Sequence, residues 1–301
     1  MAWDMKDKIV LITGGARGMG AVTGLELARM GAARVILVDW EGEEGTRTRD
    51  AINDDVGRQV AEFYYCDLSS QKQVHGLADY VITTCDALHV LVNNAGVTDS
   101  IRRLSEDGYD MHVATNHFAH FILTHRLLDL MKSSAPSRIV IVSSDAHKAG
   151  DGVDFDDLNN EALWGGKPSA NSGAFQAYHR SKLCNLYFML GLTERLEGTG
   201  VAVNALSPGY FVNTTIYRNT HGVLGFCARA VFGLLGLCGI NTPEKGARSH
   251  IYLSSADDVA GRSGLYVEHC KEKTMSDTAL DKGLRTKVWA WSEEATGSHY
   301  E

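Results

Sequence analysis

The chain has 301 residues, which is enough for one large domain, or two small ones, with a well-buried core. Its hydrophobic content of 44% and charged content of 22% are those of an ordinary soluble globular protein. The 37 acidic and 29 basic residues give a net charge of −8, which argues against nucleic-acid binding because contacts to the phosphate backbone need a basic surface.

Three features of the sequence bear on the compartment and on metal binding. Residues 1–8 lack the apolar run of a signal peptide, so we expect no secretion. The six cysteines show no C-x-x-C or metal-type spacing, and we interpret them as reduced thiols in a cytoplasmic protein. The 12 histidines form no H-E-x-x-H motif or similar cluster, so we expect no metal site.

Short apolar runs alternate with longer segments of helical period, which is the pattern of βαβ units and a parallel sheet. We expect strands at residues 9–13, 35–39, 61–65, 89–92, 138–143, 201–206 and 265–267. We expect the clearest helices at residues 19–30, 70–84, 109–131, 175–196 and 243–253. No linker, repeat or low-complexity tract divides the chain. We therefore predict a single α/β domain over residues 1–301, with a Rossmann-type doubly wound parallel sheet flanked by helices.

A glycine-rich turn follows the first predicted strand. In T-G-G-A-R-G-M-G at residues 13–20, Gly14 permits a tight turn, Gly18 lets the backbone approach a pyrophosphate, and Gly20 lets helix and strand pack closely. A pyrophosphate would bind the free N–H groups at the start of the helix. The alternative is a glycine-rich turn without a ligand, but the strand before it and the helix after it favour a dinucleotide site.

Asp39 ends the second predicted strand, where a carboxylate would bind the adenosine ribose of a dinucleotide. A carboxylate repels a 2′-phosphate, so Asp39, followed by Trp40 rather than a basic residue, favours NAD. Arg17 is an argument for NADP, because a guanidinium in the glycine turn can pair with that phosphate. We predict NAD, with NADP as the alternative. Asp67, followed by Leu68, is predicted either to accept a hydrogen bond from the adenine amino group or to cap a helix.

Residues 145–174 are polar and rich in Gly and Asn, and we expect an inserted loop there, before the next helix. That helix carries Tyr178 and Lys182, which are four residues apart and therefore lie on one face. An ammonium near a phenol favours the phenolate and lowers a pKa that is normally about 10. Such a pair can exchange a proton with an alcohol near neutral pH, although this spacing also arises by chance among 11 tyrosines.

Five motifs follow one another on the expected elements: the glycine turn, N-N-A-G at 93–96, a serine after the fifth strand, Y-x-x-x-K at 178–182 and P-G at 208–209. In this order they resemble the short-chain dehydrogenase/reductase family, and the resemblance covers the whole chain. S-S-D-A-H at 143–147, D-F-D-D-L at 154–158 and T-P-E-K-G-A at 242–247 are similar to retinol-dehydrogenase-like members of that family.

The resemblance implies four catalytic residues. Tyr178 would be the acid/base, and Lys182 would bind the nicotinamide ribose and lower the pKa of the tyrosine. Ser144 would hydrogen-bond the substrate oxygen, with Ser143 as the neighbour to test beside it. Asn116 would hold a water that relays protons to Lys182, although an asparagine within a helix is more often a packing compromise.

The resemblance also implies a nicotinamide wall at Pro208 and Gly209, with a threonine shortly after it. The usual threonine position, five residues after the proline, holds Asn213, and Thr214 follows it. Either the loop has one extra residue or Asn213 takes the role. The cofactor-binding residues that we predict are Gly14, Arg17, Gly18, Met19, Gly20, Asp39, Trp40, Asp67, Leu68, Asn94, Ala95, Gly96, Tyr178, Lys182, Pro208, Gly209, Asn213 and Thr214.

In the family, the segment after the sixth strand is a lid over the nicotinamide, which corresponds to residues 210–241 here. Residues 221–240 are strongly apolar, so we expect a hydrophobic substrate pocket or a dimer contact. Arg229 and several glycines argue against a membrane-spanning helix, whereas peripheral membrane contact stays open. Family members often pair through the helices equivalent to 109–131 and 175–196, which implies a homodimer or homotetramer.

We therefore predict an NAD(P)-dependent oxidoreductase that interconverts an alcohol and its carbonyl on a hydrophobic small molecule, such as a steroid, terpenoid, retinoid or polyketide-like compound. We expect no N-terminal membrane anchor of the kind usual in retinol-dehydrogenase-like proteins, which counts against retinoids themselves. Two alternatives are a dinucleotide-sensing protein without chemistry and a nucleotide-sugar epimerase or dehydratase. The latter proteins usually carry a T-G-x-x-G-x-x-G turn, which this chain lacks.

Overall fold

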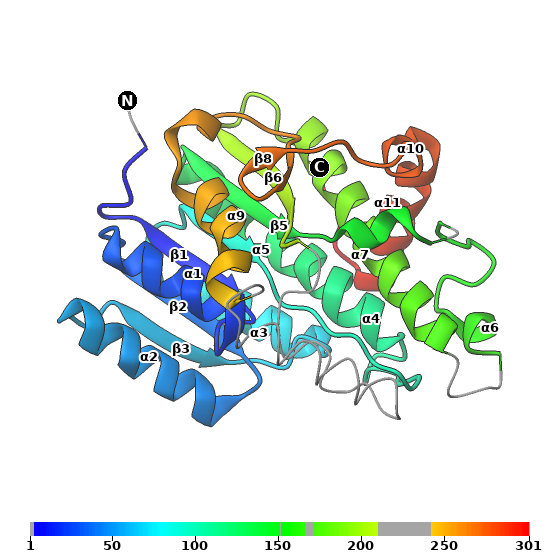
Figure 1. The fold of residues 1–301 in the computed structure, drawn as a ribbon, viewed down its shortest axis with the longest axis horizontal. Helices are drawn as coiled ribbons and strands as arrows, with labels where there is room; N and C mark the ends of the chain where they lie inside the picture. The colour runs from blue at the N-terminus through cyan, green and yellow to red at the C-terminus, as the bar shows by residue number, and fades with distance from the viewer. Residues whose placement is uncertain (1–2, 151, 166–170, 210–241, 301) are drawn as a thin grey trace.

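The structure is a computed structural model that describes residues 3–150, 152–165, 171–209 and 242–300 (Figure 1). Its centre is an eight-stranded sheet with the strand order β3-β2-β1-β4-β5-β6-β7-β8. The strands are β1 (Ile9–Thr13), β2 (Arg34–Asp39), β3 (Ala61–Tyr65), β4 (Val90–Asn93), β5 (Ser137–Val142), β6 (Val201–Ser207), β7 (Tyr266–Glu268) and β8 (Lys271–Glu272). All neighbouring strands are parallel except β7 and β8, which pair antiparallel.

The order of the strands reverses beside β1. The chain passes from β1 outward to β2 and β3, and then crosses to β4 on the other side of β1. Val10 is therefore in register with Val35 of β2 and with Val90 of β4. At such a switch point the carboxyl ends of two parallel strands leave a crevice between their loops. The glycine turn after β1 and the N-N-A-G segment after β4 meet in this crevice.

Helices cover both faces of the sheet. They are α1 (Gly18–Arg29), α2 (Gly42–Val56), α3 (Gln71–Thr84), α4 (Met111–Val113), the π-helical turn η1 (Ala114–Phe118), α5 (Ala119–Ser133), the 3₁₀ turn η2 (Asp145–Lys148), α6 (Glu161–Trp164), α7 (Asn171–Arg195), α9 (Pro243–Ser255), the 3₁₀ turn η4 (Asp257–Val259), α10 (Asp277–Leu280) and α11 (Lys282–Thr296).

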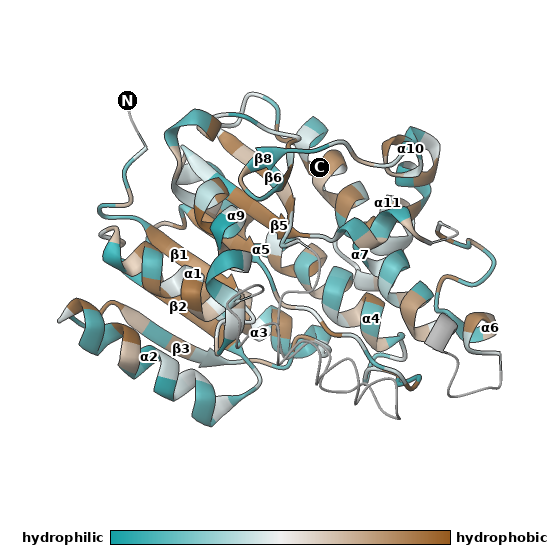
Figure 2. Ribbon diagram, viewed as in Figure 1, coloured by the Kyte–Doolittle hydropathy of each residue, from teal (hydrophilic) through white to brown (hydrophobic). Residues whose placement is uncertain are grey.

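Two apolar clusters, one on each face of the sheet, form the core. Successive strand residues point to opposite faces, so Leu11 belongs to the cluster beneath α3, α5 and α7, whereas Val10 belongs to the cluster beneath α1 and α9. Both side chains are fully buried. Figure 2 shows the central strands largely brown, whereas α2 at the periphery is largely teal. A sheet that is buried on both faces explains why its strands read as continuous apolar runs.

The predicted α/β fold with a mostly parallel sheet is confirmed, and each of the seven predicted strands is present within one residue at either end. The helix α2 is not among the clearest helices that the sequence predicts. This helix buries only Gly45, Ile52 and Asn53, so it lacks the apolar stripe by which helices are recognised. The inserted segment contains two short elements, η2 and α6, in its described part, and α7 begins at Asn171 rather than at Phe175.

The predicted lid at 210–241, with Asn213 and Thr214, lies outside the described residues. Across the ranges that the structure describes, no helix combines the length and the apolar character that crossing a membrane would require.

Candidate active site

A cavity of about 520 Å³ opens at the carboxyl ends of the central strands. Of the predicted site residues, it is lined by Gly14, Arg17, Gly18, Met19, Gly20, Asp39, Trp40, Asp67, Leu68, Asn94, Ala95, Gly96, Ser144, Tyr178, Lys182, Pro208 and Gly209. It is also lined by residues that were not predicted as site residues: Glu41, Cys66, Val97, Arg103, Met111, Thr115, Val142, Ser143, Asp145, Ala146, Ala149 and Phe175. The glycine turn and the Tyr178–Lys182 pair thus share one cavity.

The glycine turn has the backbone that its sequence predicts. Gly14 and Gly18 have φ values of 66° and 59°, in the left-handed region that favours glycine. A Cβ on Gly20 would collide with the carbonyl oxygen of Gly14, whereas a Cβ on Gly18 would meet nothing within 4 Å. The helix α1 begins here without a side-chain cap from Arg17. Its first backbone N–H groups therefore face an open space beside Gly18.

The carboxylate of Asp39 is held at the end of β2 by backbone N–H groups. Its Oδ2 accepts a hydrogen bond from Ala16 (3.1 Å), and its Oδ1 accepts one from Trp40 (2.8 Å). Beside it, the guanidinium of Arg17 forms an ion pair with Glu41. Glu41 was not predicted as a site residue. This pairing neutralises the one group in the glycine turn that counted in favour of NADP.

Asp67 lies in the cavity wall and also organises its own turn. Its Oδ1 accepts hydrogen bonds from the backbone N–H (2.9 Å) and the hydroxyl (2.8 Å) of Ser69. The cap of α3 is Ser70, whose hydroxyl accepts the N–H of Gln73 (3.3 Å). Asp67 therefore stabilises the turn before α3 without being the cap of the helix, which was one of its two predicted roles.

The N-N-A-G segment is anchored to the glycine turn. The amide nitrogen of the Asn94 side chain donates to the carbonyl of Thr13 (2.7 Å), and the backbone N–H groups of Asn94 and Ala95 donate to Oγ1 of Thr13 (2.9 and 3.0 Å). His120 joins the same group, because its Nε2 lies 3.1 Å from Oγ1 of Thr13. Burial lowers the pKa of His120 to about 3, so this histidine is neutral at physiological pH.

Tyr178 and Lys182 lie together on α7. The Nζ atom of Lys182 is 5.7 Å from the centre of the Tyr178 ring and donates a hydrogen bond to the carbonyl oxygen of Val142 (3.0 Å). The lysine is only 2% exposed. This burial lowers the pKa of Lys182 to about 8, because a charged amine loses hydration inside the protein. The pair therefore combines a phenol with an amine that gains or loses its proton near neutral pH.

The two consecutive serines after β5 differ in their surroundings. The hydroxyl of Ser143 is buried and donates to the backbone carbonyl of Lys182 (2.7 Å). The hydroxyl of Ser144 accepts the N–H of Ala146 (3.1 Å) at the start of η2, which leaves it a proton to donate. Both residues contribute to the cavity wall. The hydroxyl proton of Ser143 is thus used in a hydrogen bond to α7, whereas that of Ser144 can be donated to a substrate.

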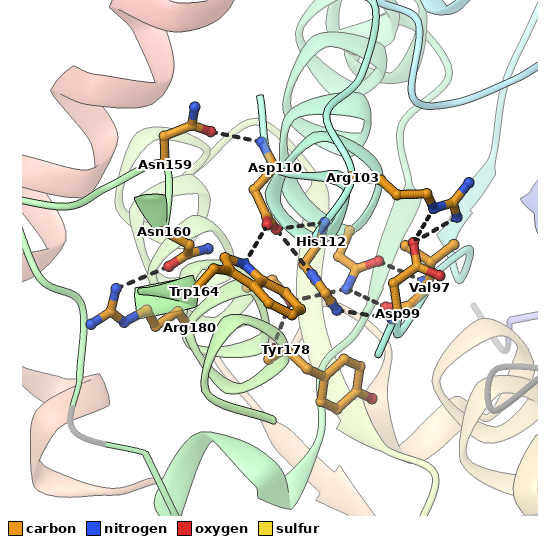
Figure 3. Close-up of polar contacts among 12 residues, drawn as sticks. Val97, Asp99, Arg103, Asp110, His112, Asn159, Asn160, Trp164, Tyr178 and Arg180 are labelled. Carbon is orange, nitrogen blue, oxygen red and sulfur yellow. Dashed lines mark hydrogen bonds and ion pairs between the residues drawn. The ribbon is translucent and has the colours of Figure 1, made fainter. Parts of the chain in front are cut away.

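Asn116 is fully buried in the π-helical turn η1 and does not line the cavity. Its Oδ1 accepts the N–H of Val97 (2.7 Å), and its Nδ2 donates to the carbonyl of Val97 (3.1 Å) and to the hydroxyl of Ser181 (2.9 Å). A Cβ on Gly96 would lie 3.3 Å from Nζ of Lys182 and 3.4 Å from Oδ1 of Asn116. Asn116 and Lys182 therefore flank Gly96. Figure 3 draws the polar contacts around Val97 and Tyr178, and both residues take part through backbone groups.

A second network was not predicted. Asp145, next to Ser144, forms an ion pair with Lys273, which also pairs with Glu268, and it accepts a hydrogen bond from the hydroxyl of Tyr266 (3.0 Å). Ser207 donates to Glu268 (3.1 Å) and accepts the N–H of Gly209 (3.2 Å). The loops that carry Ser144 and Gly209 are thus joined through β7 and the turn after it.

Comparisons with known proteins show which family the chain resembles. Residues 8–153 match the model of the family described as short chain dehydrogenase. Retinol dehydrogenase 14 of Homo sapiens is 38% identical over 313 residues, which cover 97% of this chain and 87% of that protein. Polyprenol dehydrogenase of Danio rerio is 34% identical over 295 residues, which cover 96% of this chain and 86% of that protein.

Solved structures share the fold. An uncharacterised protein from Mycobacterium paratuberculosis superimposes with a TM-score of 0.75 at 29% identity, covering all of this chain and 97% of that one. A short chain dehydrogenase from Shigella flexneri, solved in complex with NADP, gives a TM-score of 0.66 at 21% identity, covering 90% of this chain and 100% of that one. At that identity the likeness concerns the fold alone.

Proposed function

Because the chain belongs to the short-chain dehydrogenase/reductase family and is an oxidoreductase that interconverts an alcohol and its carbonyl on a hydrophobic molecule, we propose that Tyr178 is its acid/base and NAD its preferred cofactor. The comparisons favour neither a dinucleotide sensor without chemistry nor a nucleotide-sugar epimerase. The observation that carries the proposal is the presence of the glycine turn, Ser144, Tyr178 and Lys182 in the wall of one cavity.

The residues of the cavity fit a nicotinamide dinucleotide. The open space beside Gly18, at the uncapped start of α1, suits a pyrophosphate, because backbone N–H groups and the helix dipole both favour an anion there. Asp39 at the end of β2 would bind the adenosine ribose, and Lys182 would bind the nicotinamide ribose. When bound, the dinucleotide accepts or supplies a hydride at the substrate carbon.

The protein's contribution is a proton at the substrate oxygen. In the direction of oxidation, Tyr178 as the phenolate accepts the hydroxyl proton, and in the direction of reduction the phenol returns it. The Lys182 ammonium stabilises the phenolate by electrostatic attraction, which is strong because the amine is buried away from water. Ser144 donates a hydrogen bond to the substrate oxygen and holds it within reach of Tyr178. Asn116 lies on the other side of Gly96 from Lys182 and holds the neighbouring Val97 by two hydrogen bonds.

Two features support NAD over NADP. Asp39 lies in the cavity wall, where it would face the adenosine ribose, and its carboxylate would repel the 2′-phosphate of NADP. Arg17, which could otherwise pair with that phosphate, is already paired with Glu41. The end of the cavity that would bind the adenosine ribose therefore holds two carboxylates, those of Asp39 and Glu41, and one guanidinium, that of Arg17.

The apolar part of the cavity wall supports a hydrophobic substrate. Val97, Met111, Ala146, Ala149 and Phe175 line it. Retinol dehydrogenase 14 and polyprenol dehydrogenase, to which the chain is similar, are named for alcohols with long apolar bodies. We infer a substrate of that kind, with one reacting hydroxyl or carbonyl group and an apolar body in contact with this wall.

Replacement of the acid/base tests the proposal. Tyr178→Phe should bind NAD with unchanged affinity, because the ring is kept, and should lose roughly 10³-fold or more in kcat for alcohol oxidation. Affinity is measured by titration of protein fluorescence and turnover by NADH absorbance, with a panel of alcohols graded by size. Full activity of this variant would refute the role of Tyr178.

A further inference from the structure

A buried aspartate–histidine pair lies beside the cavity but has no part in the proposed chemistry. Asp110 and His112 are each 1% exposed. Oδ1 of Asp110 accepts hydrogen bonds from the backbone N–H of His112 (3.0 Å) and from its Nδ1 (2.9 Å). Nε2 of His112 lies 3.0 Å from the backbone N–H of Asp99, which can only donate. His112 therefore carries its proton on Nδ1 and accepts at Nε2.

The inserted segment packs against this pair (Figure 3). Oδ2 of Asp110 accepts a hydrogen bond from Nε1 of Trp164 in α6 (3.0 Å), and the indole ring, itself 3% exposed, stacks on the imidazole of His112. Asn159 adds a second link, because its Oδ1 accepts the backbone N–H of Asp110 (2.6 Å). Both carboxylate oxygens of Asp110 are thus hydrogen-bonded, Oδ1 to His112 and Oδ2 to Trp164 of the inserted segment.

On its other side, His112 holds a loop that forms part of the cavity wall. The loop from Val97 to Arg103 is fixed at Val97 by the side chain of Asn116 and at Asp99 by Nε2 of His112. The carboxylate of Asp99 in turn pairs with the guanidinium of Arg103 (2.6 Å). Val97, Arg103 and Met111 all line the cavity, and Met111 lies between Asp110 and His112 in the chain. None of these three wall residues belongs to the predicted cofactor site.

We propose that Asp110, His112 and Trp164 are positioning residues through which the inserted segment sets the shape of the substrate wall and so the size of substrate that the enzyme accepts. This inference rests on the proposed function, because it assigns the wall to the substrate. The physical reason is that the hydrogen bonds that lead from Trp164 through Asp110 and His112 to the backbone N–H of Asp99 are all made by buried residues. Loss of one donor leaves a buried acceptor without a partner, and the loop shifts to relieve it.

The test is Trp164→Phe, which keeps an aromatic ring over His112 but removes the indole N–H. Trp289→Phe is the matched control, because Nε1 of Trp289 also donates to a carboxylate, that of Glu293 (3.0 Å), on α11. Hydrogen exchange in residues 97–103 is measured for both variants. We expect Trp164→Phe to speed this exchange roughly fivefold or more and the control to leave it unchanged.

The same variants are assayed on linear alcohols from butanol to dodecanol. Trp164→Phe should lower kcat/KM for the longest alcohol roughly tenfold, mainly through KM, while kcat for the shortest alcohol and the affinity for NAD change less than about twofold. Equal losses on short and long alcohols, or unchanged exchange in 97–103, would overturn the inference. A wild-type enzyme that oxidises no alcohol would instead refute the proposed function. The hydrogen-exchange measurement would still show whether Trp164 positions residues 97–103.

A second pair of variants covers the case in which Trp164→Phe does not fold. His112→Gln retains an amide that can accept the N–H of Asp99, whereas His112→Leu cannot. The positioning role requires that the glutamine variant exchange more slowly in residues 97–103 than the leucine variant. Identical exchange in the two would contradict it.

Discussion

The ammonium of Lys182 lies 5.7 Å from the centre of the Tyr178 ring, and the same group donates to the carbonyl of Val142 at 3.0 Å. The lysine is fixed between the end of β5 and the phenol, and burial lowers its pKa to about 8. Hydrogen-bond acceptors beside the amine favour its charged form and raise that pKa. The hydroxyl oxygens of the nicotinamide ribose would be such acceptors, so the protonation of Lys182 and cofactor binding are coupled.

This coupling predicts that NAD binds more weakly as the pH rises through about 8. Below that pH the free enzyme already carries the ammonium, and affinity is constant. Above it, binding must first take up a proton, so the Kd should rise roughly five- to tenfold between pH 7 and pH 9. Buried His120 and His250, with pKa values lowered to about 3 and about 4, stay neutral throughout this range. Fluorescence titration at several pH values measures the effect.

Lys182→Met is the control for this prediction. It has no amine to titrate, so below pH 8 its Kd for NAD should be higher than that of the wild type. Above pH 8 its Kd should stay constant. A rise in Kd of the same steepness in Lys182→Met would assign the pH dependence to another group.

The two serines after β5 should separate into a catalytic and a structural residue. Ser144→Ala removes the donor to the substrate oxygen and should lower kcat about 100-fold or more, with little change in stability. Ser143→Ala removes a buried hydrogen bond to the carbonyl of Lys182 and should lower the free energy of unfolding by about 1 kcal/mol. Turnover and denaturant unfolding of both variants measure the two effects. A larger loss of kcat in Ser143→Ala than in Ser144→Ala would reverse the assignment.

The parts of the site that could be predicted from sequence are local. Tyr178 and Lys182 lie on one face because a helix repeats every 3.6 residues, and the glycine turn is recognisable because Gly14 and Gly18 adopt backbone angles that other residues avoid. The choice between Ser143 and Ser144 was harder, because consecutive residues in an extended backbone point in opposite directions. Only the packing of α7 against β5 shows which serine is buried.

The parts that sequence could not reveal depend on contacts between distant segments. Glu41 reaches Arg17 because the end of β2 lies beside the start of α1, and nothing in the local pattern of either residue signals the pair. Lys273 and Asp145 are separated by more than one hundred residues, and they meet only because β7 lies beside β6 in the sheet. Such pairs become visible only when the order of the strands is known.

Glu41 should therefore influence the choice of cofactor. Glu41→Gln removes the charge that pairs with Arg17, which frees the guanidinium to bind a 2′-phosphate. We expect the ratio of kcat/KM for NADP to that for NAD to rise about tenfold. Glu44→Gln is the matched control, because Glu44 pairs with Arg47 on α2 and does not line the cavity. A ratio that is the same in wild type and both variants would show that Arg17 does not contact the ribose end of the cofactor.

The C-terminal helix α11 lies on α5 and α7, the helices that correspond to the pairing surface implied by the family resemblance. The ring of Trp289 packs against Phe121 (5.1 Å between ring centres) and Phe188 (6.0 Å). Tyr300 donates its hydroxyl proton to the carbonyl of Phe121 (2.6 Å), and Arg285 pairs with Glu194 of α7 (2.6 Å). The apolar surface of α5 and α7 that a partner subunit would bury is thus already covered by residues 282–300 of the same chain.

We accordingly predict that the wild-type protein does not form the expected homodimer or homotetramer through α5 and α7. Light scattering should give the mass of one chain, because α11 covers this surface at an intramolecular, and therefore high, effective concentration. Trp289→Ala should lower the free energy of unfolding by about 3 kcal/mol and promote self-association, since it uncovers Phe121 and Phe188. Ile82→Ala, at an exposed apolar residue of α3, is the control that should do neither. A wild-type dimer whose formation slows hydrogen exchange in α5 and α7 would show that the partner binds despite α11, and would contradict this prediction.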